Sequence, residues 1–186
     1  LDDAVSLAQS MVDVGNGAGM PTQALVTDMS VPLAWSAGNA VEVQEAVDYL
    51  RGEGARHPRL DEVVLALGSR LLVAGGLESD LTAAKHALVR VRDDGSALER
   101  MANVVEKMGG DPRVTERPEK VLGRAPVVKP LQASHGGKLT GFDVRGLGMA
   151  VVALGGGRTI PDAAIDPRVG LSKLPLAGTI FEPGDP

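Results

Sequence analysis

Helical periodicity in the first 110 residues, and its loss afterwards, most strongly limits what this chain can fold into. Apolar residues recur every three or four positions, which predicts helices over about 1–14, 40–51, 60–74, 81–91 and 97–108. From Asp111 onward most of the twelve prolines occur, and short β-branched runs replace the helical spacing. The pattern predicts an α/β fold. Residues 1–110 form its helical part, with one short buried strand at 24–27, and residues 111–186 form a small β-rich C-terminal unit.

Composition excludes several classes of function. The chain has no cysteine, which excludes disulfides, thiolate nucleophiles and cysteine-type zinc sites. Its 19 Lys and Arg against 24 Asp and Glu give a net charge of −5, which argues against nucleic acid as the main partner. No run of 18 apolar residues occurs, so no membrane-spanning segment is expected.

Two short motifs could carry chemistry, and each has a structural alternative. Three glycines at 155–157 followed by Arg158 could cradle a phosphate, but the run lacks the spacing of known phosphate loops, so a connecting loop is the favoured interpretation. Asp28 follows the predicted strand, where α/β enzymes often place a catalytic carboxylate. An aspartate that caps a turn explains Asp28 equally well.

The segment from Pro32 to Glu45 carries a third pattern. An apolar, irregular loop containing the only tryptophan leads into a predicted helix with two glutamates, Glu42 and Glu45. Irregular backbone leaves carbonyl oxygens without partners, and such oxygens beside one carboxylate suit a hard cation of low charge. The alternative is an ordinary capped helix after a packed loop, with Asn39 and Glu42 as a capping box.

Ordered blocks of this sequence resemble the thymidine-cleaving members of the pyrimidine-nucleoside phosphorylase family. The blocks lie at residues 14–19, 27–47 and 145–170. The resemblance extends over nearly the whole chain, with looser matching between about 76 and 130. It implies the helix-rich part of the phosphorylase α/β domain followed by a β-rich C-terminal unit.

The resemblance also implies an activity. Such enzymes are cytoplasmic homodimers that cleave a pyrimidine deoxynucleoside with inorganic phosphate, giving the free base and deoxyribose 1-phosphate. Their phosphate-binding and base-binding motifs are not found in this chain, so no catalytic or substrate-binding residue is assigned to it. The apolar first residue and the final turn signal suggest a fragment, which we expect to be inactive alone and to lack the helical dimerisation domain.

Two other interpretations stay open at this point. One is a related pyrimidine-nucleoside phosphorylase with a different base or sugar preference, because the resemblance places the residues that choose the base upstream of this chain. The other is a non-enzymatic module in which the β-rich unit docks a partner.

One site of the family carries over to residues of this sequence. Some members bind a monovalent cation, potassium, beside the phosphate. The resemblance implies that Leu33 and Ser36 supply backbone carbonyls to this cation and that Glu45 supplies its carboxylate.

Overall fold

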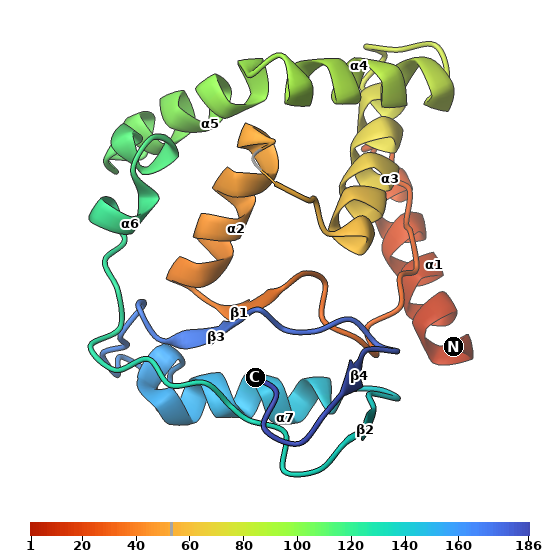
Figure 1. The fold of residues 1–186 in the computed structure, drawn as a ribbon. Coiled ribbons are helices and arrows are strands. Elements are labelled where there is room, and N and C mark those ends of the chain that lie inside the picture. Colours follow the sequence, from red (N-terminus) through yellow and green to blue (C-terminus); the bar gives the residue numbers. More distant parts are fainter. Residues whose placement is uncertain (53) are drawn as a thin grey trace.

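The computed structural model describes residues 1–52 and 54–186 and shows helices arranged around one central helix (Figure 1). The α-helices are α1 (Asp2–Gly17), α2 (Ala40–Arg51), α3 (Pro58–Ala74), α4 (Leu81–Asp93), α5 (Ser96–Lys107), α6 (Pro118–Val121) and α7 (Val144–Val151). A 3-10 helix, η1 (Pro112–Thr115), and a π-helical turn, η2 (Val152–Gly156), complete the helical elements. No helix in the described part is long and apolar enough to cross a membrane.

Helix α2 is central to the packing. It contacts α4, α5 and α6, while α3 and α4 pack against each other beside it (Figure 1). Val47, near the middle of α2, is fully buried. The buried apolar residues of the core are Ala40, Val47, Tyr49, Leu65, Ala84, Val114 and Val151. The periodicity predicted α2 to α5 correctly, and each of these four helices packs against at least one of the others.

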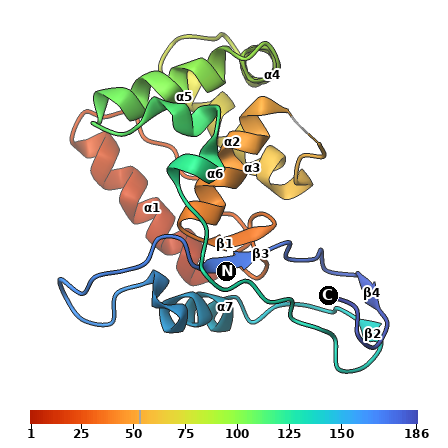
Figure 2. The same ribbon diagram turned by 60° about the vertical axis from the view of Figure 1, so that its left-hand side comes forward.

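Within residues 1–52 and 54–186, four short strands form two antiparallel pairs. They are β1 (Ser36–Gly38), β2 (Gly137–Lys138), β3 (Gly170–Ser172) and β4 (Ile180–Phe181). Strand β1 pairs with β3, and β2 pairs with β4. The β1–β3 approach requires glycine, because a Cβ on Gly170 would lie 2.7 Å from the Ala37 carbonyl oxygen. Helix α7 packs against β1 (Figure 2).

The predicted helix-rich fold with a small strand part is confirmed, but one predicted strand is wrong. Residues 24–27 form no strand, and Val26 is 44% exposed. A strand needs a hydrogen-bonding neighbour, and none of the described residues pairs with this run. The C-terminal unit contains only short strands, and two helices and two helical turns lie within 111–186 as well.

Helix α1 ends at a turn that its own sequence dictates. Gly15 lies directly against Thr22, and a Cβ there would be 2.1 Å from the Thr22 hydroxyl oxygen. The Asn16 side chain accepts a hydrogen bond of 2.9 Å from the Thr22 backbone N–H. The C-terminal end of α1 therefore packs closely against the residues that follow it.

Candidate functional site

The loop before α2 is fastened to the helix by Glu45. One carboxylate oxygen of Glu45 accepts a hydrogen bond of 2.8 Å from the Trp35 backbone N–H. The other accepts a hydrogen bond from the Ser36 hydroxyl. The side chain thus points back toward the N-terminus of the helix, the direction that helical geometry favours. Two of the three residues predicted to bind a cation, Ser36 and Glu45, are in contact.

Leu33, the third residue predicted to bind a cation, lies two positions before Trp35 and is 47% exposed. Within residues 1–52 and 54–186, no hydrogen-bond donor reaches the Leu33 carbonyl oxygen, which leaves it available as a ligand. The same described part holds no group of three His, Asp or Glu side chains suited to a metal. A cation here would therefore depend on carbonyl oxygens and one carboxylate.

His57 packs against Trp35 in the loop before α2. Its ring meets Trp35 edge-on, with ring centroids 5.0 Å apart. The residue is only 5% exposed, and its Nδ1 atom has no hydrogen-bond partner among the described residues. Burial lowers the pKa of His57, an effect that the nearby Glu45 charge opposes and Arg59 reinforces. A neutral imidazole is therefore packed beside the Glu45 carboxylate.

Trp35, Glu45 and His57 line a cavity of about 260 Å³, which we call the Glu45 cavity. Ten further residues complete its lining, namely Ser36, Val41, Gln44, Asp48, Tyr49, Ala55, Arg56, Leu60, Ser172 and Lys173. His57 was not predicted to be part of this site. Its position immediately before Pro58 indicates only the start of α3 and not its packing against Trp35.

Residues near the C-terminal end hold the loop from the other side. The Leu174 backbone N–H donates to the Trp35 carbonyl at 2.8 Å. The Asn39 side-chain amide donates to the Gly156 carbonyl at 2.8 Å. The glycine run at 155–157 is therefore anchored to the start of α2, which favours the predicted loop over a phosphate cradle.

The predicted capping box at the start of α2 is wrong. Asn39 makes no side-chain hydrogen bond to the helix, and its side-chain N–H donates instead to the Gly156 carbonyl. The Glu42 carboxylate accepts from the Gly38 backbone N–H at 2.8 Å, one residue earlier than a capping box requires. The helix start is thus fixed by contacts distant in sequence.

Asp28 caps a turn. Its carboxylate accepts a hydrogen bond of 2.8 Å from the Ser30 backbone N–H and lies 3.8 Å from the Arg59 guanidinium. Hydrogen bonding to Ser30 lowers the pKa of Asp28. The hydrogen bond from Ser30 is the contact that the turn-capping alternative requires.

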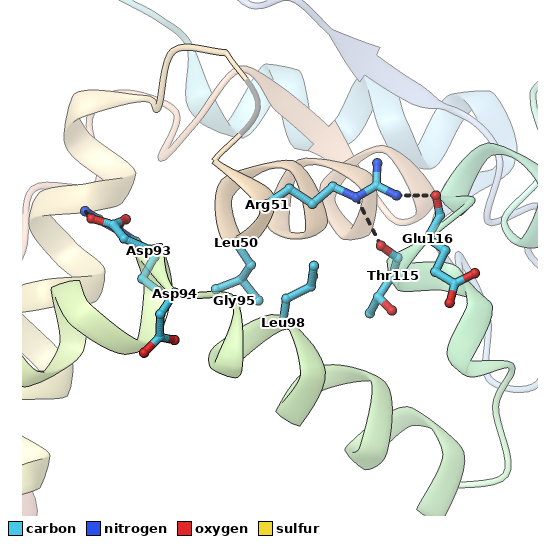
Figure 3. A pocket seen from close by; sticks show the side chains of 9 residues that line it. Leu50, Arg51, Asp93, Asp94, Gly95, Leu98, Thr115 and Glu116 are labelled. Carbon is cyan, nitrogen blue, oxygen red and sulfur yellow. Dashed lines mark hydrogen bonds and ion pairs between the residues drawn. The ribbon is translucent and has the colours of Figure 1, made fainter.

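A second, larger cavity lies between the C-terminal end of α2, the α4–α5 corner and η1 (Figure 3). Its volume is about 650 Å³. Arg51 extends across it and donates to the carbonyl oxygens of Thr115, at 3.0 Å, and Glu116 (Figure 3). Asp93 and Asp94 approach from the other side. Arg51 thus joins α2 to η1, and the cavity has the character of an open packing groove.

Comparison with known proteins identifies the family. Residues 1–98 match the model described as glycosyl transferase family, a/b domain, and residues 138–186 match the pyrimidine nucleoside phosphorylase C-terminal domain. The chain belongs to this glycosyl transferase family. The resemblance seen in the sequence is thereby confirmed.

Individual relatives match along the chain. It is 48% identical to a thymidine phosphorylase of Burkholderia cenocepacia (strain HI2424) over 185 residues and 47% identical to one of Rhizobium meliloti (strain 1021) over 180 residues. These alignments cover 100% and 97% of this chain but only 42% and 41% of the relatives. The chain therefore spans less than half the length of these curated relatives.

Proposed function

We propose that this chain is part of a thymidine phosphorylase, which cleaves thymidine with inorganic phosphate to thymine and 2-deoxy-D-ribose 1-phosphate. The observation that carries the proposal is 48% identity to enzymes of that name along the chain's length. In this reaction a phosphate oxygen bonds to the sugar C1′ atom as the glycosidic bond to the base breaks. Positioning of phosphate and stabilisation of the departing base anion lower the barrier.

The chain's own contribution is structural and lies beside the phosphate. We assign it no catalytic or substrate-binding residue, because the phosphate-binding and base-binding motifs of the family are not found in its sequence. The resemblance places the groups that touch thymidine outside residues 1–186. The residues around the Glu45 cavity then support those groups and do not touch thymidine themselves.

The activity test compares the full-length protein with the 186-residue chain. Purified full-length protein should convert thymidine to thymine only when phosphate is added, and the 186-residue chain should not. Parallel assays with uridine and deoxyuridine separate a thymidine phosphorylase from a related enzyme of other specificity. No phosphate-dependent cleavage of any pyrimidine nucleoside by the full-length protein would overturn the proposal.

We further propose that Leu33 and Ser36, through their carbonyl oxygens, and Glu45, through its carboxylate, hold a potassium ion in the full-length enzyme. The direction of the Glu45 side chain and the unused Leu33 carbonyl support this. A bound monovalent cation supplies positive charge beside the phosphate. Glu45→Gln should weaken the potassium dependence of the full-length enzyme, whereas Glu42→Gln, on the same helix, should leave it unchanged. Equal potassium dependence in both variants would contradict the assignment.

The finer organisation is proposed from the same resemblance. We propose a cytoplasmic homodimer joined outside residues 1–186, and a division of this chain into residues 1–110 and 111–186. The two family matches support a division because they leave residues 99–137 between them. Light scattering on the full-length protein tests the dimer, and limited proteolysis should cut first between 109 and 126. First cuts within α2 or α3 would contradict the division.

A further inference from the structure

Trp35 is held by three separate elements, although it lies in a loop. Its backbone N–H donates to the Glu45 carboxylate of α2 at 2.8 Å. Its backbone carbonyl accepts a hydrogen bond of 2.8 Å from the Leu174 N–H, just after β3. Its ring meets the ring of His57, at the start of α3, with centroids 5.0 Å apart. The backbone and the side chain of Trp35 are therefore both fixed.

The direction of the neighbouring Ser36 carbonyl follows from these contacts. The Trp35 carbonyl faces the chain that continues β3, because it accepts from Leu174. The Ala37 carbonyl faces β3 as well, since a Cβ on Gly170 would lie 2.7 Å from its oxygen. Successive carbonyls of an extended chain point to opposite sides, so the Ser36 carbonyl between them points away from β3. It is therefore free of the β1–β3 ladder.

The His57 side chain is buried without serving the helix that it precedes. It makes no hydrogen bond to the first turn of α3, and its Nδ1 atom has no partner among the described residues. Pro58 begins the helix, and a proline at that position has no N–H group that needs a cap. The residue is nonetheless only 5% exposed. Its burial therefore indicates packing against Trp35 and not capping of α3.

We propose that His57 is a positioning residue, which holds the Trp35 ring and thereby keeps the carbonyl oxygens of the loop in their direction. This rests on the potassium site proposed above, whose carbonyl ligands come from Leu33 and Ser36. These residues lie two positions before and one position after Trp35, so a rotation of Trp35 would turn both carbonyls. An edge-to-face ring pair changes an equilibrium constant by about two- to tenfold, which sets the size of the expected effect.

Three variants of the full-length protein separate ring packing from general stability. His57→Leu keeps the position apolar and filled but removes the ring, whereas His57→Phe keeps a ring. Leu65→Ala changes a buried residue of the same helix and is the control for a general loss of stability.

Two measurements are made on each variant. The first is amide hydrogen exchange at Trp35 relative to exchange at Val47, which lies in the middle of α2. The second is the potassium chloride concentration that gives half of the maximal rise in melting temperature, at constant ionic strength. Neither measurement depends on thymidine cleavage.

His57→Leu should increase the relative exchange rate of the Trp35 amide, and the required potassium concentration, by about three- to tenfold. His57→Phe and Leu65→Ala should leave both at the wild-type values. No change in His57→Leu, or an equal change in either of the other variants, would overturn the proposal.

The positioning role and the potassium site can fail separately. If potassium does not stabilise the wild-type protein, yet His57→Leu increases Trp35 exchange as expected, the potassium ion is overturned and the positioning of the loop stands. If His57→Leu does not fold, Trp35→Leu removes the other ring of the pair and should weaken potassium binding by the same factor. An unchanged potassium affinity in Trp35→Leu would overturn the proposal.

Discussion

Removing the Glu45 carboxylate tests whether this side chain fastens the loop before α2. Glu45→Ala deletes two acceptors at once, the one for the Trp35 N–H and the one for the Ser36 hydroxyl. Both bonds are half-buried, so neither donor can fully recover its bond from water. The matched control is Glu42→Ala on the same helix, whose single bond to the Gly38 N–H is exposed.

The expected magnitude follows from the number and burial of these bonds. A hydrogen bond to a charged group contributes about 1.5 kcal/mol or more when partly buried, so Glu45→Ala should lower the free energy of unfolding by about 2–3 kcal/mol. Glu42→Ala should lower it by about 0.5 kcal/mol, since water replaces an exposed bond. The gain in helix propensity from glutamate to alanine is the same in both variants and cancels in the comparison.

Urea unfolding of the 186-residue chain, followed by tryptophan fluorescence, measures both variants because Trp35 is the only tryptophan. Ser36→Ala combined with Glu45→Ala in a double-mutant cycle isolates the hydroxyl–carboxylate bond, with an expected coupling of about 1 kcal/mol. Losses for Glu45→Ala within about 0.5 kcal/mol of those for Glu42→Ala would refute the role of this carboxylate.

Two other predictions concern the packing around α2. Arg92, which is largely buried between Asp61 and Asp93, should cost about 2–4 kcal/mol of unfolding free energy when changed to alanine. Arg113 is exposed, so Arg113→Ala should lower the free energy of unfolding by less than about 0.5 kcal/mol in the same urea titration. Equal losses in the two variants would contradict the larger contribution of the buried Arg92. Burial lowers the pKa of His57 below its ordinary 6.5, so its unfolded form takes up a proton first. Stability should therefore fall as pH drops below 6.5 toward the folded pKa. His57→Gln should reduce the fall in melting temperature between pH 7 and pH 5. An unchanged fall would show that His57 does not cause it.

The sequence predicted the helices well because their signal is local. Apolar residues at helical spacing locate α2 to α5, and each element forms its backbone hydrogen bonds within itself. Strands lack this independence, since each needs a neighbour that can lie anywhere in the chain. Residues 24–27 have the composition of a strand and no partner among the described residues, whereas β1 forms within the loop that was predicted to be irregular.

The candidate site shows the same limit. The loop, α2 and the approach of Glu45 to Ser36 were predictable, because a glutamate side chain reaches back along its own helix. The contribution of His57 was not, since its burial depends on how α3 packs beside Trp35. The bond from Asn39 to Gly156 joins residues 117 positions apart, so no local capping pattern could predict it.

Long-range contacts connect the residues of the two family matches. The loop at 33–39 belongs to the a/b domain match, yet residues beyond 138 complete its support: Gly170 pairs with Gly38, and Ala40 donates its N–H to the Pro167 carbonyl at 2.9 Å. Lys173, held at a positive φ of 59°, lines the Glu45 cavity from the same side. A side chain in that conformation costs about 1 kcal/mol and persists only where its surroundings impose it. Residues of the C-terminal match therefore line one side of the Glu45 cavity, whereas Glu45 itself belongs to the a/b domain match.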